Sequence, residues 1–241
     1  MKHIVQFSGG KDSTAMLLMM LNNNMPVDDI VFCDTGKEFP AMYDHIAAVE
    51  KLIGRKVTVL KAEYSFDHYF LNHKRTKGKN IGVKGYGWAS MRIRWCTKAL
   101  KVKPTSDYLK NQGDYTLYIG IAADEPKRHK NIAKNVIHPL FDWGITESMA
   151  LEYCYNRGFD WNGLYKDFRR VSCYLCPLQR IGDWRLLRKK YPELYADALR
   201  LDRLNPLKED QLKKGWFSLE KLERRFANEE RQQSLFQIIS L

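Results

Sequence analysis

The stretch that decides the fold is VQFSGGKDSTAMLLMM, residues 5–20. A short apolar run ends before Ser8, a Gly-Gly-Lys-Asp segment follows, and a long apolar run begins after Ser13. Glycine has no Cβ, so a loop rich in glycine lets the backbone approach a ligand closely. The first turn of the following helix presents unpaired N–H groups, which favour an anion. We therefore predict a strand, a phosphate-binding loop over residues 8–13, and a helix.

This loop differs from the two common nucleotide-binding motifs. In the Walker-type P-loop, Gly-Lys is followed directly by Ser or Thr and is preceded by another glycine. Here Gly10 and Lys11 are followed by Asp12, and position 5 is valine. The Gly-x-Gly-x-x-Gly pattern does not fit either. The structural alternative is a plain strand-to-helix turn capped by Ser8 or Asp12.

Strands and helices alternate along the first half of the chain. Strands are predicted over residues 3–7, 29–33, 56–63 and 115–125, and helices lie between them. This alternation predicts an α/β fold with a doubly wound parallel sheet. We expect a nucleotide-binding core over residues 1–145, with a basic insertion at about 64–95. The remaining residues, 146–241, are expected to form a cysteine-bearing and mostly helical C-terminal region.

The composition is that of a globular protein, with 44% hydrophobic and 28% charged residues. No apolar run reaches the length of a membrane span, so we expect no membrane segment. The N-terminal residues run directly into the first predicted strand, which predicts no signal peptide and a cytoplasmic location.

The net charge of +12 is concentrated in one segment. Residues 74–103 contain no Asp or Glu and ten basic residues: Lys74, Arg75, Lys77, Lys79, Lys84, Arg92, Arg94, Lys98, Lys101 and Lys103. A solvated basic face is one explanation. The other is a surface for the phosphates of a nucleotide or of a nucleic acid.

Several motifs together resemble a known superfamily. SGGKDS is similar to the pyrophosphate loop of the N-type ATP pyrophosphatases, or adenine nucleotide alpha hydrolases. The blocks VFCDTGKEFP (31–40), RWCTKALKVKP (94–104), GIAADEPKRHK (120–130), HPLFDW (138–143) and GLYKDFRRVSCYLCPL (163–178) resemble its phosphoadenosine phosphosulfate (PAPS) reductase branch. The resemblance implies an adenine nucleotide alpha hydrolase-like fold that holds ATP, often with magnesium.

The motifs and their chemistry assign candidate site residues. Those expected to bind the nucleotide are Ser8, Gly9, Gly10, Lys11, Asp12, Ser13, Asp34, Thr35, Lys98, Lys101 and Gly120. Lys11, Asp12, Asp124 and Arg128 are the expected catalytic residues. In these roles Asp12 helps to position magnesium, while the cations neutralise charge that develops on the phosphates.

The cysteines indicate metal or redox chemistry. Cys173 and Cys176 form a Cys-x-x-Cys pair, and their block and that of Cys96 resemble the cluster-ligand blocks of the pyrophosphatase subunit of DNA phosphorothioation systems. We expect these three to hold a [4Fe–4S] cluster, with zinc or reduced thiols as alternatives. A fourth ligand is Cys154, His138 or an exogenous sulfide. Cys33 lies within a predicted strand and is expected to be buried.

Two departures from the branch bear on activity. Ala122 stands where the family usually has arginine, and residues 177–241 contain no cysteine to act as the thiol nucleophile of a PAPS reductase. We therefore expect an enzyme that cleaves ATP to AMP and pyrophosphate and activates a substrate, nucleic acid included, for sulfur transfer. The alternatives are a thiol-dependent reductase of PAPS or its 3′-dephospho analogue, and a non-catalytic nucleotide- or nucleic-acid-binding module. Expected partners are a sulfur donor, further copies of the chain, or the other subunits of a modification complex.

Overall fold

The chain folds into two compact units in a computed structural model that describes residues 1–77, 80–130, 133–207 and 218–239. Unit 1 comprises residues 1–62 and 99–173, and unit 2 comprises residues 63–98 and 174–241. Each unit is described by itself.

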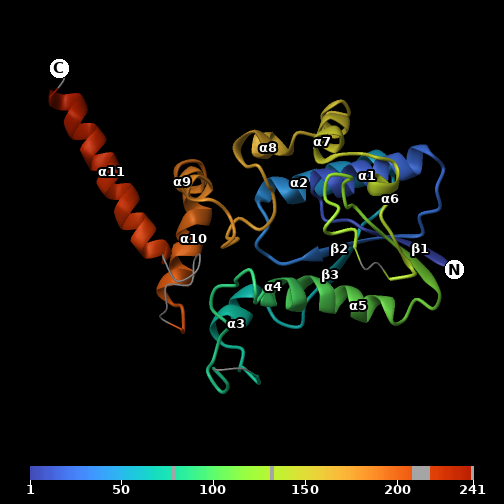
Figure 1. Ribbon diagram of the computed structural model, residues 1–241, viewed down its shortest axis with the longest axis horizontal. Helices are drawn as coiled ribbons and strands as arrows, with labels where there is room; N and C mark the ends of the chain where they lie inside the picture. The colour runs from blue at the N-terminus through green and yellow to red at the C-terminus, as the bar shows by residue number, and fades with distance from the viewer. Residues whose placement is uncertain (78–79, 131–132, 208–217, 240–241) are drawn as a thin grey trace. The chain divides into compact units, whose positions relative to one another are not determined.

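Unit 1 is built on a parallel sheet (Figure 1). Its strands are β1 (Lys2–Gln6), β2 (Asp29–Asp34), β3 (Thr58–Lys61), β4 (Tyr115–Ile119) and β5 (Val136–Ile137). Their order in the sheet is β3-β2-β1-β4-β5, and every pairing is parallel. The predicted parallel α/β fold is confirmed. The short β5 was not predicted, because two residues carry no periodic pattern.

Helices cover both faces of this sheet, which makes it doubly wound. Figure 1 shows α1 (Lys11–Asn22) and α2 (Pro40–Ile53) on one face, and α5 (Lys103–Leu109) on the other. The unit also contains α6 (Pro139–Asp142), α7 (Glu147–Tyr155), the short turn η2 (Trp161–Gly163) and α8 (Leu164–Asp167). A further short helix, η1 (Lys98–Val102), precedes α5.

The order of the strands defines where a ligand can enter. From β1 the chain winds outward through β2 to β3, and then returns to place β4 on the other side of β1. The carboxyl ends of β1 and β4 therefore form a topological switch point, the usual location of ligand sites in open α/β sheets. Ile4 and Val5 of β1 are fully buried, so this strand is fixed in the core.

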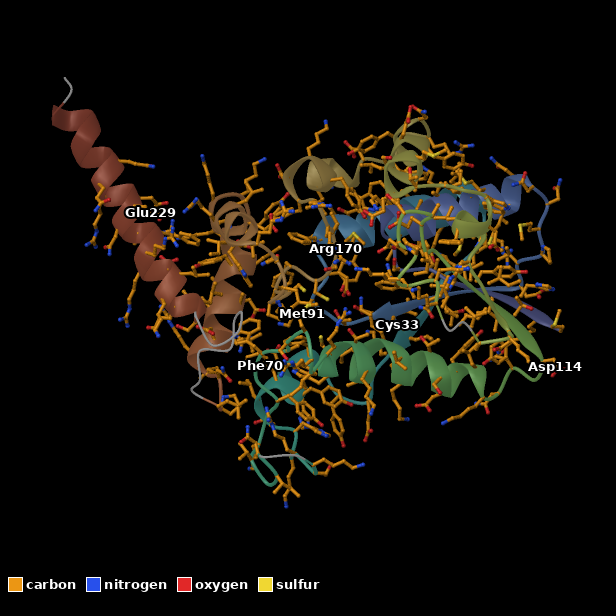
Figure 2. All side chains as sticks on the ribbon, in the orientation of Figure 1. Cys33, Phe70, Met91, Asp114, Arg170 and Glu229 are labelled. Atoms are coloured by element: carbon orange, nitrogen blue, oxygen red, sulfur yellow. The ribbon has the colours of Figure 1, made fainter. Side chains whose placement is uncertain are left out.

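Cys33 shows how tightly α5 is joined to the sheet. It lies in β2 with 4% of its surface exposed, and Figure 2 shows it facing α5. Its Sγ is 3.2 Å from Thr105 Oγ1 and donates to the carbonyl of Lys101 at 3.4 Å. The prediction that Cys33 is buried is confirmed.

Unit 2 is a helical unit with an aromatic core. Its helices are α3 (Phe66–Leu71), α4 (Trp95–Thr97), α9 (Ile181–Lys190), α10 (Pro192–Arg203) and α11 (Leu219–Ile239). The indole ring of Trp88 meets that of Trp184 edge-on at 6.3 Å, and its Nε1 donates to Asp202 Oδ1 at 2.6 Å. The other oxygen of Asp202 accepts from the backbone N–H of Glu220 at 2.9 Å, at the start of α11.

The boundaries of the two units differ from the predicted single division of the chain at residue 145. The segment expected as an insertion in the core packs with the C-terminal helices, because its buried aromatic side chains find their partners there. Residues 146–173 pack with unit 1, where α7 lies against α1. A boundary between independently folding domains at residue 145 stays a prediction.

None of the helices in the described parts of the chain combines the length and the apolar character needed to cross a bilayer.

Buried His45 makes the stability of unit 1 depend on pH. Its Nε2 lies 2.9 Å from Thr14 Oγ1, its ring stacks on Trp161 at 4.2 Å, and burial lowers its pKa from 6.5 to about 4. The unfolded chain therefore binds a proton between pH 6.5 and 4 that the folded chain does not, so stability falls as the pH falls through this window.

We expect acidification from pH 7 to pH 5 to lower the free energy of unfolding by about 2 kcal/mol through His45. His138, whose pKa burial also lowers, contributes with the same sign. Urea unfolding of the wild type and of His45→Gln at both pH values isolates the His45 part. Equal losses in the two proteins would show that His45 does not titrate in this way.

Candidate functional site

The loop after β1 has the form of an anion cradle. Ser8 and Ser13 close it, with their Oγ atoms 2.9 Å apart and the backbone N–H of Ser8 donating to Ser13 Oγ at 3.1 Å. Gly9 has a φ of +74°, and a Cβ there would lie 3.2 Å from side-chain atoms of Met42 and Ile46. Glycine is therefore required at position 9 both by conformation and by space.

Side chains from the end of α7 to α8 form hydrogen bonds with the backbone of this loop. Trp161 Nε1 donates to the carbonyl of Gly9 at 2.7 Å, and the hydroxyl of Tyr165 accepts from the backbone N–H of Lys11 at 2.8 Å. Cys154 Sγ donates to the carbonyl of Lys11 at 3.5 Å. Sequence analysis did not assign Trp161 or Tyr165 a role, although Tyr165 lies in the quoted block 163–178.

The predicted catalytic residues Lys11, Asp12 and Asp124 come together around a fourth residue, Glu147. Lys11 Nζ lies 2.9 Å from Asp12 Oδ1 and 3.1 Å from Glu147 Oε2, and the side chain of Lys11 is only 9% exposed. Asp124 Oδ1 accepts from the backbone N–H of Glu147 at 3.0 Å, at the start of α7. Burial raises the pKa of Asp12, while the charge of Lys11 opposes this rise.

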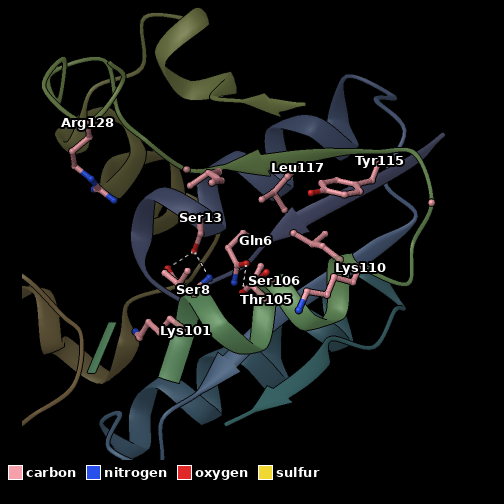
Figure 3. Close-up of a pocket in the computed structure, with 15 residues that line it drawn as sticks. Gln6, Ser8, Ser13, Lys101, Thr105, Ser106, Lys110, Tyr115, Leu117 and Arg128 are labelled. Atoms are coloured by element: carbon pink, nitrogen blue, oxygen red, sulfur yellow. Dashed lines mark hydrogen bonds between the residues drawn. The ribbon is translucent and has the colours of Figure 1, made fainter. Parts of the chain in front are cut away.

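A pocket of about 720 Å³ opens at the switch point (Figure 3). One part of its wall is polar or basic and consists of Ser8, Ser13, Lys101, Gly120 and Arg128. The rest includes the polar or basic side chains of Gln6, Thr105, Ser106 and Lys110, together with Leu109, Tyr115, Leu117 and Ile119. Thr105 Oγ1 donates to Gln6 Oε1 at 3.1 Å, which joins α5 to β1 across the pocket floor.

Arg128 is much more exposed to solvent than Lys11. It is half exposed and pairs with Glu125 at 2.7 Å, a surface pair that contributes little to stability. Its guanidinium therefore rearranges toward a bound anion at little cost. Ala122, where the family has arginine, is fully buried.

Not every predicted nucleotide ligand lines this pocket. Asp34 accepts from the backbone N–H of Gly36 and from the hydroxyl of Tyr43, both at 2.8 Å. Thr35 Oγ1 donates to Glu38 at 2.8 Å. Lys98 is exposed and belongs to unit 2. The predicted nucleotide ligands that are not among the residues lining the pocket are Gly9, Gly10, Lys11, Asp12, Asp34, Thr35 and Lys98. Their roles stay predictions.

Glu38 is a buried carboxylate that sequence analysis did not single out. It forms an antiparallel β-bridge with Cys173, and Cys173 Sγ lies 3.8 Å from Glu38 Oε1. Lys101 Nζ lies 3.8 Å from the same oxygen. Cys173 and Lys101 are thus joined through one carboxylate at the end of β2.

The other two predicted metal ligands, Cys96 and Cys176, belong to unit 2. Burial raises the pKa of Cys96, and the negative charge of Cys176 adds to the rise. Among the residues that the structure describes, no group of three or more His, Cys, Asp and Glu side chains is arranged to hold a metal ion. As a donor set, two cysteines three residues apart, Cys173 and Cys176, with a third from a distant segment, Cys96, suit iron or zinc.

The two side chains considered as a fourth ligand have other partners. Cys154 is fully buried behind the phosphate loop, and burial raises the pKa of its thiol to about 12, which keeps the thiol protonated. His138 is buried, with its Nδ1 3.2 Å from Nδ1 of His129.

Gly120 is the position where the pocket is most sensitive to added bulk. A Cβ at Gly120 would lie 2.9 Å from the backbone N of Ser13 and 3.0 Å from the backbone C of Asp12. Because these are backbone atoms at the start of α1, we expect Gly120→Ala to displace the loop and to destabilise unit 1 by about 1–3 kcal/mol. Hydrogen exchange over residues 8–14 should accelerate.

Gly182→Ala is the matched control, since a Cβ there meets nothing within 4 Å. It should leave the unfolding free energy within about 1 kcal/mol of the wild type. Similar unfolding and exchange for the two variants would contradict the close contact between Gly120 and α1.

Several known proteins are similar to this chain in sequence. The family model described as the phosphoadenosine phosphosulfate reductase domain matches residues 2–179. An uncharacterized protein of Methanocaldococcus jannaschii is 28% identical over 205 residues, which are 80% of this chain and 39% of that protein. An uncharacterized nin region protein of Escherichia phage lambda is 33% identical over 148 residues, 54% of this chain and 51% of that protein. The chain thus spans about half or less of these curated relatives.

Two solved structures are similar at low sequence identity. A PAPS reductase from Candida auris in a phosphate complex has a TM-score of 0.47 and 18% identity, covering 70% of this chain and 80% of that chain. The U34-tRNA thiolase from Methanococcus maripaludis with its [4Fe–4S] cluster has a TM-score of 0.42 and 16% identity, covering 84% and 72%. With the family model matching 178 consecutive residues, from 2 to 179, this chain belongs to the phosphoadenosine phosphosulfate reductase domain family.

Proposed function

We propose that the chain binds ATP in the pocket at the switch point and transfers the adenylyl group to an acceptor. The observation that carries this proposal is the pocket itself. Its volume of about 720 Å³ falls in the range of small-molecule sites, about 300–1,000 Å³. Ser8 and Ser13, at the two ends of the glycine loop, share one part of the wall with two cations, and phosphates would fit there. The apolar side chains of Leu109, Leu117 and Ile119 in the rest of the wall suit the base.

The residues of this wall have separate tasks. The Ser8 and Ser13 hydroxyls hold phosphate oxygens, together with N–H groups in the first turn of α1 that follow Lys11, whose own N–H is donated to Tyr165. Lys101 and Arg128 neutralise the charge that develops as the bond to the pyrophosphate breaks. Asp12 helps to hold Mg²⁺, which requires Lys11 to exchange one of its two carboxylate partners for a phosphate oxygen.

The reaction is a substitution at the α-phosphorus. An oxygen of the acceptor attacks that phosphorus, the bond to the oxygen that bridges to the β-phosphorus breaks, and pyrophosphate leaves. A sulfide donor then forms a carbon–sulfur bond on the acceptor while the carbon–oxygen bond breaks and AMP leaves. The conversion needs no external oxidant or reductant.

Cys96, Cys173 and Cys176 are the residues that would hold a [4Fe–4S] cluster, with zinc as the alternative metal. When bound, the cluster would supply an open iron position for sulfide. Glu38 and Thr35 orient Cys173 through the contacts at 3.8 and 3.6 Å. We also propose that the protein is located in the cytoplasm. It assembles there with further copies of itself or with the subunits of a modification complex.

ATP labelled at the α-phosphate should give AMP and pyrophosphate in the presence of Mg²⁺ and an acceptor. We expect Arg128→Ala and Lys101→Ala each to lower the rate by about 100-fold, because each removes a charge beside the phosphates. Lys51→Ala, an exposed lysine of α2, is the control and should act as the wild type.

Release of ADP in place of AMP with every acceptor tested would overturn the proposal. Sulfite formed from PAPS with a thiol donor would instead establish the reductase. Candidate acceptors should include RNA and DNA as well as small molecules.

The metal prediction has a spectroscopic test. Anaerobically purified protein should be brown, absorb broadly in the visible range and contain about four iron atoms per chain. Ser substitutions of Cys96, Cys173 or Cys176 should each remove most of the colour. Cys33→Ser, which changes a buried thiol in β2, should keep it. A colourless protein that contains zinc would favour the alternative, and one that contains neither metal would favour reduced thiols.

A further inference from the structure

Unit 2 carries a basic hairpin, which we define as residues 73–77 and 80–86. Lys74 and Lys84 form an antiparallel β-bridge, and the backbone N–H of Gly85 donates to the carbonyl of His73 at 2.9 Å. Figure 1 shows the chain leaving the end of α3 in this loop and returning beside the helix. The described residues of this part of the basic insertion therefore have a defined backbone conformation.

The charges of this hairpin are not balanced. Lys74, Lys77 and Lys84 are exposed, and within the described part of the chain no carboxylate forms an ion pair with any of them. The β-bridge places Lys74 directly opposite Lys84, and like charges in that position destabilise a strand pair. A bound polyanion would remove this repulsion.

The base of the hairpin is held rigidly by unit 2. Gly85 has a φ of +78°, and a Cβ there would lie 2.6 Å from the carbonyl oxygen of Leu71 and from Pro206. Arg75 Nε donates to the carbonyl of Gly85 at 2.8 Å, and its guanidinium lies 5.6 Å from the ring centre of Tyr86. The lysines are thus presented by a loop that needs little further ordering when a ligand binds.

Aromatic rings adjoin the base of the basic hairpin. Tyr64 is 40% exposed and stacks on His68 at 4.3 Å, with the two rings 18° from parallel. His73 lies 6.1 Å from Tyr64 and 5.1 Å from Tyr86. The acidic neighbours are Glu63, which bonds to Tyr64, and Asp67, which pairs with Arg200. An exposed ring beside unpaired lysines suits unstacked bases on a phosphate backbone.

From this arrangement we infer that the basic hairpin, with Tyr64, binds single-stranded nucleic acid. The lysines contact the phosphates, and Tyr64 stacks on a base. A duplex does not offer a free base face to Tyr64, so single strands are preferred. Binding uses unit 2 alone and therefore holds whether or not the chain cleaves ATP. Combined with the proposed adenylation, it identifies the acceptor as a nucleic acid.

The test measures binding of fluorescent oligonucleotides of about 16 nucleotides to the full chain, without ATP. Single-stranded RNA, single-stranded DNA, duplex DNA and vesicles of anionic lipid form the four arms. We expect both single strands to bind more tightly than the duplex. Affinity should fall steeply between about 50 and 200 mM salt. Whichever of single-stranded RNA and single-stranded DNA binds more tightly identifies the type of nucleic acid that the hairpin recognises.

Charge and ring are then tested separately. Lys74→Gln, Lys77→Gln and Lys84→Gln combined should weaken single-strand binding by about tenfold or more and lower the salt slope by about two. The control combines Lys51→Gln, Lys166→Gln and Lys189→Gln, which removes the same charge from exposed lysines elsewhere. Tyr64→Ala should weaken single-strand binding by about fivefold, whereas Tyr64→Phe retains it.

Three results would overturn this assignment. The first is that the two triple Lys→Gln variants weaken single-strand binding equally, which would mean that binding depends only on the net charge of the protein. The second is duplex binding as tight as single-strand binding and unaffected by Tyr64→Ala. The third is binding to the vesicles with none to the oligonucleotides, which would identify a membrane-surface contact. Circular dichroism and thermal unfolding verify that each variant is folded.

Discussion

The hydrogen bond from Trp161 Nε1 to the carbonyl of Gly9 is the contact on which the site depends. Gly9 is in the left-handed region, and the indole at 2.7 Å fixes the direction of its peptide. The hydroxyl of Tyr165 holds the next turn through the N–H of Lys11. Together they set the direction in which α1 begins, and hence where its free N–H groups and Ser13 face.

The basic side chains near the glycine loop fall into two groups, the buried Lys11 and the residues in the wall of the pocket. Lys11 is buried between Asp12 and Glu147, so its charge is already neutralised within unit 1. A buried lysine without such partners would be costly. The basic side chains in the wall of the pocket are Lys101 of η1, Lys110 after α5 and Arg128 after β4. Each of them pairs with a carboxylate, and each lies far from the glycine loop in the sequence.

Unit 2 is held by aromatic packing rather than by a sheet. Trp88, Trp184 and Asp202 join the segment before α4 to the C-terminal helices, and this packing supports the base of the basic hairpin. The same segment carries Cys96. Cys176 also belongs to unit 2, whereas Cys173 is the last residue of unit 1.

Local patterns in the sequence were enough to predict the strands β1 to β4, the helices α1 and α2, and the phosphate loop. Alternation, apolar runs and a Gly-Gly turn act between near neighbours, and each has a physical cause within a few residues. The same reasoning found Ser8, Ser13 and Gly120, which line the pocket. Arg128 and Lys101 were recognised through blocks of the family.

What the tertiary structure alone decided was which distant residues complete the site. Tyr165, Trp161 and Glu147 lie 154, 152 and 136 positions from the loop residues that they contact. No periodicity connects residues so far apart. The same holds for Glu38 with Cys173, and for the packing of residues 63–98 with the C-terminal helices. The sequence by itself determined the sheet and the glycine turn after β1, because short-range sterics and hydrogen bonding set them. Tertiary packing decided the contacts of Trp161 and Tyr165 with the glycine loop, the ion pairs of Lys11 and the division into units. These features depend on surfaces that meet only when the chain is packed.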